Sequence, residues 1–263
     1  MFKRELKVNL KSFILWSVLI VGLYMMVYAI YPSITNGEQV ELINEMLKVF
    51  PNEILMAFNM DISTLDHAYG WLKSEGFVFI LLIIGCYSGM LGSSIVLKEE
   101  NDKTIEYLHS LPVKRVNIVL SKVFASLFYI VLMVIIVTLF NYVGLKYSGE
   151  FDVKQFFVLS MTPLLSSLPL FSICLFISTF MHKTKTMSAT ALGLTFAMYI
   201  IQVISTLSKD VEFLKYISVY TLADIRTVIL ESSINHYMII ISLLITVIGI
   251  VATLIRYNFK EMI

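Results

Sequence analysis

The stretch KEENDKTIEYLHSLPVKR, residues 98–115, is a charged interruption between two long apolar runs. Within it an apolar residue recurs every three positions from Ile105 to Leu111, and the positions between are mostly polar, which predicts a short amphipathic helix. Asn101 is the expected N-cap of this helix. Pro112 is expected to end it, because proline disfavours helical geometry at the preceding residue.

The composition excludes an ordinary soluble domain. Of the 263 residues, 58% are hydrophobic and 15% are charged, whereas soluble domains have about 45–50% and about 25%. Both cysteines, Cys86 and Cys174, fall inside apolar runs, so neither a disulfide framework nor a metal site is predicted. The chain is therefore predicted to be an all-α polytopic membrane protein with a single transmembrane domain, residues 1–263.

Six apolar runs are long enough to cross a bilayer, which takes about 20 residues. They are predicted at residues 13–31, 76–97, 117–141, 156–181, 187–206 and 235–256. Residues 1–12 form a basic amphipathic pattern, which predicts a separate elbow helix in the membrane interface. Two short amphipathic helices are expected on the outer surface between residues 43 and 58, and another short helix around residues 223–230.

The distribution of Lys and Arg predicts the orientation. Twelve of them lie in the segments 1–12, 98–115, 182–186 and 256–263, whereas seven lie in the three loops on the other side. Loops rich in Lys and Arg stay on the cytoplasmic side. Both termini and residues 98–115 are therefore predicted to be cytoplasmic.

Two spans carry small residues at four-residue spacing. Gly85 and Gly89 lie in the second span, and Ala189 and Gly193 lie in the fifth. Such spacing lets two helices approach closely, so these residues are predicted to form helix-packing faces, with incidental spacing as the alternative. The fourth span contains two prolines, which are expected to bend it.

Several absences narrow the function. No Asp, Glu, Lys or Arg lies in the middle of a predicted span, and Lys122 lies near the inner end of the third. Ion-coupled transporters generally need intramembrane ionisable groups, so an ion-driven mechanism is disfavoured. No GxxxxGK[ST], HExxH or GxSxG motif occurs, which disfavours ATP binding by a phosphate loop and gives no support to a membrane enzyme. The energy for any transport would have to come from a partner.

Residues 98–122, KEENDKTIEYLHSLPVKRVNIVLSK, resemble the six-span permease subunits of ATP-binding-cassette exporters that lack a fused nucleotide-binding domain, such as bacterial peptide and drug exporter permeases. The shared pattern is an acidic start, a threonine-led helix, Leu-Ser-Leu-Pro-Val and a basic pair before the third span. A weaker match is FPNEILMAF, residues 50–58. The chain departs from the pattern at Lys103, which takes the place of a glycine before the threonine.

The resemblance implies two permease chains, identical or related, and two cassette ATPase chains in the bacterial plasma membrane. ATP and Mg would be bound by the ATPases, and this chain would hold no cofactor, catalytic residue or nucleic acid. Residues 98–115 would be the cytoplasmic coupling helix that docks on the ATPase, and the alternative is a solvated connector. The expected polar contacts are Glu99, Glu100, Asp102, Glu106 and His109, and the expected apolar contacts are Tyr107, Leu108 and Leu111.

Export of a hydrophobic or amphipathic substrate is the predicted function. The first outer loop is acidic and would attract cationic molecules, which favours peptides such as cytolytic or antimicrobial ones. Two alternatives remain open. One is an ion-coupled secondary transporter, and the other is a membrane sensor or immunity protein that binds a toxic peptide without moving it.

Overall fold

The computed structural model describes residues 1–34, 45, 49, 68–104 and 113–259, and every regular element in this part of the chain is helical. Six helices in it are long and apolar enough to cross a membrane. They are α1 (Phe2–Ile34), α5 (Phe77–Ser94), α8 (Arg115–Ser148), α9 (Val153–Ser178), α10 (Thr184–Leu207) and α12 (His236–Phe259). The prediction of an all-α polytopic membrane protein with six spans is confirmed.

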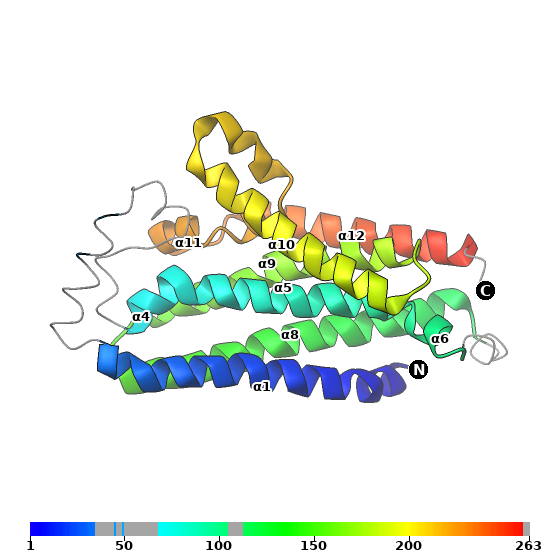
Figure 1. The fold of residues 1–263 in the computed structure, drawn as a ribbon, viewed down its shortest axis with the longest axis horizontal. Helices are drawn as coiled ribbons and strands as arrows, with labels where there is room; N and C mark the ends of the chain where they lie inside the picture. Colours follow the sequence, from blue (N-terminus) through cyan, green and yellow to red (C-terminus); the bar gives the residue numbers. More distant parts are fainter. Residues whose placement is uncertain (35–44, 46–48, 50–67, 105–112, 260–263) are drawn as a thin grey trace.

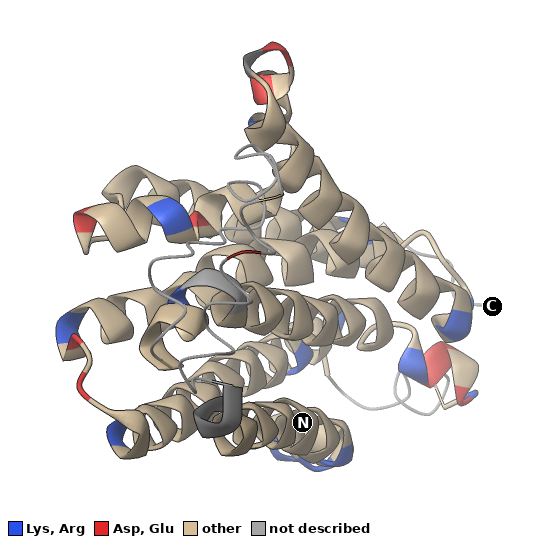
Figure 2. Ribbon diagram, turned by 60° about the vertical axis from the view of Figure 1, so that its left-hand side comes forward, with Lys and Arg blue, Asp and Glu red and all other residues tan. Residues whose placement is uncertain are grey.

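The bundle has two distinct ends. The short helix α6 (Lys98–Asn101) lies at the same end as the start of α1 and the end of α12, and we call this the α6 end (Figure 1). The short helices α4 (Ala68–Trp71) and α11 (Ile225–Glu231) lie at the opposite end, the α4 end. Figure 2 shows that most charged residues lie near the ends of the long helices.

The loop between α10 and α12 contains the predicted short helix. It is found as α11, and two 3₁₀ helices precede it, Lys209–Tyr216 and Val219–Ala223. The second of these is buried, with Tyr220 fully inside the bundle. The two outer helices predicted between residues 43 and 58 lie outside the described residues, apart from residues 45 and 49.

The separate elbow helix predicted for residues 1–12 needs correction, because α1 is one helix from Phe2 to Ile34. The first twelve residues contain no glycine or proline that would end a helix. They are also held along α8: the hydroxyl of Tyr129 donates a hydrogen bond to the Leu6 carbonyl at 2.6 Å, and its ring lies 4.8 Å from that of Phe13. The basic turns therefore continue the first span.

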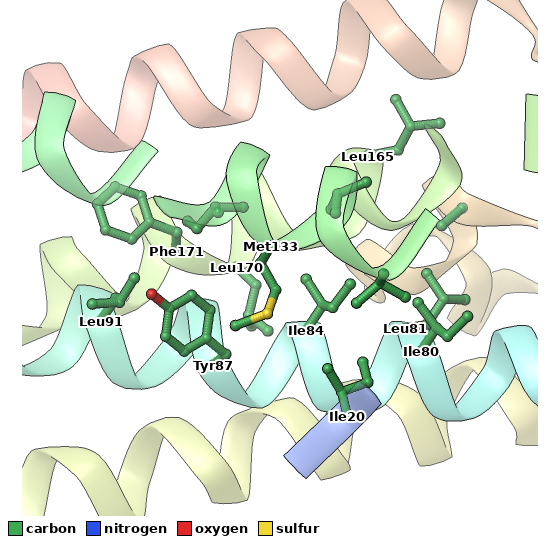
Figure 3. Close-up of a cluster of buried hydrophobic side chains, with 14 of the residues drawn as sticks. Ile20, Ile80, Leu81, Ile84, Tyr87, Leu91, Met133, Leu165, Leu170 and Phe171 are labelled. Atoms are coloured by element: carbon green, nitrogen blue, oxygen red, sulfur yellow. The ribbon is translucent and has the colours of Figure 1, made fainter. Parts of the chain in front are cut away.

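The central helices α5 and α9 form the core of the bundle (Figure 3). Ile84 and Tyr87 of α5 and Phe171 of α9 are each at most 1% exposed. Gly92 of α5 allows the close approach, since a β-carbon there would lie 2.4 Å from the Phe171 carbonyl oxygen. Side chains from α1 and α8 complete this cluster (Figure 3).

The two carbonyls that the prolines of α9 leave free both receive a replacement donor. A proline lacks the N–H that would bond the carbonyl four residues earlier, so Pro163 frees the Leu159 carbonyl and Pro169 frees the Leu165 carbonyl. The hydroxyl of Thr162 donates to Leu159 at 2.7 Å. That of Ser242 in α12 donates to Leu165 at 2.9 Å. The second replacement bond ties α12 to α9, as expected where neighbours satisfy freed carbonyls in a membrane.

Candidate coupling site

The first residues of the segment 98–115 form α6 and its C-terminal turn. The N–H of Thr104 donates to the Glu99 carbonyl at 2.9 Å, and the N–H of Lys103 donates to the Glu100 carbonyl at 3.3 Å. These two bonds are those of a Schellman motif. Lys103 has a φ of +52°, the left-handed conformation that glycine adopts without strain. The position at which the resembled family often has glycine thus has a glycine-type backbone here, although lysine occupies it.

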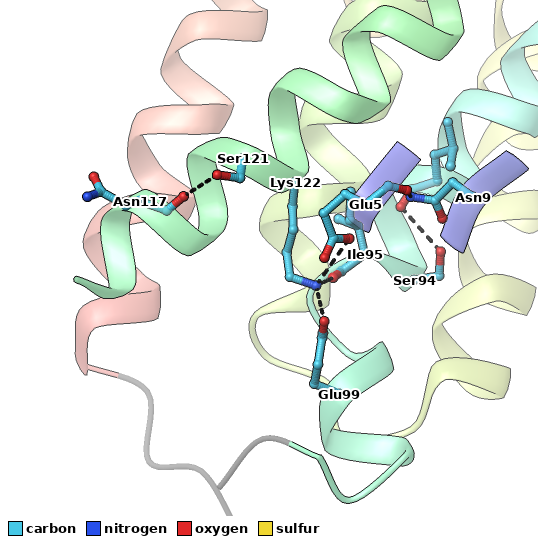
Figure 4. A network of polar contacts seen from close by, with 9 residues as sticks. Glu5, Asn9, Ser94, Ile95, Glu99, Asn117, Ser121 and Lys122 are labelled. Carbon is cyan, nitrogen blue, oxygen red and sulfur yellow. Dashed lines mark hydrogen bonds and ion pairs between the residues drawn. The ribbon is translucent and has the colours of Figure 1, made fainter. Parts of the chain in front are cut away.

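A buried ion cluster joins α6 to α1 and α8 (Figure 4). Lys122 of α8 is 3% exposed, and its Nζ lies 2.5 Å from Glu99 of α6 and 3.7 Å from Glu5 of α1. The two carboxylate residues are 5% and 6% exposed, and Nζ also donates to the Ile95 carbonyl at 2.8 Å. Buried charges are costly unless they are paired and hydrogen-bonded. The cluster therefore fixes the start of the segment 98–115 against two spans.

Asn101, the last residue of α6, joins this segment to a third span. Its side-chain oxygen accepts a hydrogen bond from the Thr184 N–H at 3.3 Å, at the start of α10. Its side-chain nitrogen donates to the Leu97 carbonyl at 2.8 Å and to the His182 carbonyl at 3.4 Å. Asn101 was expected to cap the helix that follows it, but its side chain instead satisfies a free N–H group at the start of α10.

The other end of the segment contacts α12. The guanidinium of Arg115, the first residue of α8, donates to the Asn258 carbonyl at 3.4 Å. Next to it, Tyr257 is 2% exposed. Arg256 lies over the ring of Phe180, 5.2 Å from its centroid, just beyond the end of α9. The described parts of the segment 98–115 thus contact α8 and the ends of α10 and α12, and Lys122 links them to the start of α1.

The predicted ATPase contacts have different positions. Glu99 is removed from the proposed docking surface, because its carboxylate points inward to Lys122. Glu100 is half-buried, and Asp102 is exposed beside it. The remaining predicted contacts, Glu106, Tyr107, Leu108, His109 and Leu111, lie outside the described residues.

The predicted packing faces also differ from each other. A β-carbon on Gly85 would lie 2.2 Å from the Tyr220 hydroxyl, and one on Gly89 would lie 3.3 Å from the Thr195 hydroxyl of α10. Gly85 and Gly89 therefore lie where other elements of the chain approach α5. By contrast, Ala189 and Gly193 are exposed, and no atom of the described residues lies within 4 Å of a β-carbon built on Gly193.

Sequence reasoning missed the roles of Glu5 and Lys122. Glu5 lies within the basic amphipathic pattern of residues 1–12, and Lys122 lies near the inner end of a predicted span, so the pattern of neither segment predicts a partner for it. A signal was present, because Glu5 is the one acidic residue among the first 37. A lysine within an apolar helix also requires a buried partner.

Comparisons with known proteins place the chain in a family. No curated protein and no solved structure matches it. A family model described as ABC-2 family transporter protein matches residues 2–262, which is almost the whole chain. The protein is therefore a multi-pass membrane permease that belongs to the ABC-2 transporter family, whose members associate with ATP-binding-cassette ATPase subunits.

Proposed function

We propose that this permease is part of an exporter in which separate ATPase chains bind the segment 98–115 and move two permease chains. One observation carries the proposal: the described parts of that segment contact α8, α10 and α12, and they are linked to α1 through Lys122 of the ion cluster. A displacement of the segment would therefore change its contacts with several spans. A solvated connector has no need of such contacts, and no phosphate loop occurs in the chain itself.

A second permease chain would pack on the exposed face of α10. Ala189, Gly193 and Ala197 share this face at four-residue spacing and are exposed. In membranes, helices associate through small residues that let their backbones approach. The space beside Gly193 supports the proposal, because the part of the chain that the structure describes leaves it open.

The distribution of charged residues supports an orientation in the membrane, and a cavity supports a class of substrate. The α6 end would face the bacterial cytoplasm, since the segments predicted to lie there carry most of the Lys and Arg. A cavity of about 850 Å³ at the α4 end lies between α1 and α8 and is lined by aromatic residues, among them Tyr28, Phe140 and Phe151. This apolar cavity and the acidic sequence of the first outer loop favour amphipathic, cationic peptides as the exported molecules.

Purification of the tagged chain from membranes of its own host tests the proposal. An ATPase with a phosphate-loop sequence is expected to co-purify at one ATPase per permease, together with a second permease chain.

Leu108→Ala and Glu106→Ala are expected to reduce the bound ATPase by about tenfold or more, as for central contacts of an interface. Lys215→Ala, beyond the far end of α10, is the control and should leave it unchanged. A chain that transports peptide with an ion gradient and without any ATPase would overturn the proposal.

A further inference from the structure

One ammonium group serves two carboxylates in the ion cluster. Lys122 Nζ hydrogen-bonds Glu99 at 2.5 Å and the Ile95 carbonyl at 2.8 Å, whereas its nearest distance to Glu5 is 3.7 Å. The distance from Lys122 Nζ to Glu5 fits an ion pair but is too long for a hydrogen bond. Glu5 is thus a second counter-ion close to an ammonium that is bonded to Glu99 (Figure 4).

The two carboxylates belong to different parts of the bundle. Glu5 and Lys122 lie on α1 and α8, which are held together by the bond from Tyr129 to Leu6 and by the ring contact near it. Glu99 lies on α6, which is four residues long and is followed, two residues beyond its end, by Lys103 in the left-handed conformation. A displacement of α6 would therefore move Glu99 relative to Lys122 and leave Glu5 in place.

The presence of Glu5 lowers the free energy that is needed to move Glu99 away from Lys122. An ammonium left buried without a counter-ion is strongly unfavourable. With Glu5 present, Lys122 stays paired when Glu99 leaves it, and Glu99 can be hydrated at the end of the bundle. Two discrete pairings, rather than a continuous deformation, are the usual basis of a conformational switch.

We propose that Lys122 is a positioning residue that exchanges Glu99 for Glu5 when the ATPase moves the segment 98–115. The proposal rests on the proposed function, because the ATPase supplies the displacement. It gives the two carboxylates opposite roles: Glu99 holds α6 in the position described here, and Glu5 stabilises the displaced position. A structural ion cluster would give them the same role.

Distance measurements between two spin labels test the exchange. The labels are placed at Thr104→Cys, just after α6, and at Asn117→Cys on α8, because both positions are exposed. The native cysteines, Cys86 and Cys174, are buried and should remain unlabelled. Pulsed electron paramagnetic resonance is recorded on the complex with its ATPase, without nucleotide and with ATP and vanadate. The unmodified pair is expected to show one distance without nucleotide and a second, longer one when trapped.

Glu99→Gln and Glu5→Gln are expected to act in opposite directions. Glu99→Gln should populate the second distance without nucleotide, because Lys122 remains paired with Glu5. Glu5→Gln should hold the first distance even with ATP and vanadate, and should lower the ATPase rate by about tenfold or more, because the displaced state would leave Lys122 unpaired. Lys215→Met breaks an exposed ion pair with Glu212 and is the control that should change neither.

If Glu99→Gln and Glu5→Gln had equal effects on the label distance, the ATPase rate and thermal stability, the exchange would be overturned. The ion cluster would then have a purely structural role. Glu99→Asp and Glu5→Asp keep the charge and shorten the reach, so they provide the same comparison if either glutamine variant fails to fold. Failure of the proposed function has a different signature: no ATPase would co-purify with the unmodified chain.

Discussion

Helices α5 and α10 are similarly apolar and both carry spaced small residues, but they are used differently. In the most apolar 18-residue window of each helix, 67% of the residues are buried in α5 and 17% in α10. The glycines of α5 lie against other elements of the same chain, whereas no described residue lies within 4 Å of a β-carbon built on Gly193 of α10. The same sequence pattern thus serves internal packing in one span and leaves a free face in the other.

Gly92→Ala should show the largest effect, because the added methyl group would meet the backbone of α9. Overpacking of this kind typically costs about 1–3 kcal/mol, and we expect the upper end because a backbone carbonyl cannot rotate away. The measurement is thermal unfolding in detergent with a thiol-reactive dye. The buried thiols of Cys86 and Cys174 become accessible only on unfolding.

Gly193→Ala is the matched control for this prediction. It makes the same change in the middle of a spanning helix, where the new methyl group would meet no atom of the described chain within 4 Å. Alanine favours a helix over glycine by about 1 kcal/mol, so the unfolding temperature should stay the same or rise. Equal destabilisation by both substitutions would contradict the contrast between the two helices.

Ser242→Ala should have an intermediate effect, because it removes a hydrogen bond that joins α12 to the proline-containing helix α9. Hydrogen bonds between membrane helices are worth about 0.6 kcal/mol on average and about 1.7 kcal/mol at most, and we expect about 1 kcal/mol since the Leu165 carbonyl would lose its donor. Ser160→Ala is the control, because the Ser160 hydroxyl donates to the Phe156 carbonyl, one turn earlier in its own helix. If Ser160→Ala lowered the free energy of unfolding by as much, the bond between Ser242 and Leu165 would contribute no more than a bond within one helix.

Spans could be predicted from the sequence because a bilayer imposes a minimum length of apolar helix. Their ends were less predictable. The third span was expected over residues 117–141, yet α8 runs from Arg115 to Ser148, since a helix can extend beyond the apolar region. The break expected before residue 13 is absent, because contacts with α8 hold those turns along the bundle.

The coupling site was only partly predictable, for a different physical reason. Periodicity indicates which side of a helix is polar, but it does not show that Glu99 meets Lys122 from another helix. The direction of a polar side chain depends on partners far away in the sequence, as Asn101 also illustrates by bonding the start of α10. The spacing of small residues likewise does not show whether another helix packs on them, because this depends on how the whole bundle is arranged.

Gly193→Leu should have the smallest effect on unfolding, within about 0.5 kcal/mol, because its side chain would extend into open space. Its expected effect is on association: a leucine would keep a second α10 from approaching closely. Cross-linking of the permease in lipid vesicles should therefore show dimers for the unmodified chain and mainly monomers for the Gly193→Leu variant, at unchanged stability.

Gly22→Leu is the control that separates association from lipid contact. Gly22 is also exposed in a spanning helix, and a β-carbon on it would have no described residue within 4 Å, but no small residue lies four positions before it or four after it. Both leucines would face lipid equally well, so a general effect of bulk in the membrane would alter cross-linking in both variants. Loss of dimers with Gly193→Leu alone would show that α10 presents a specific surface, and loss with neither would place the second permease chain elsewhere.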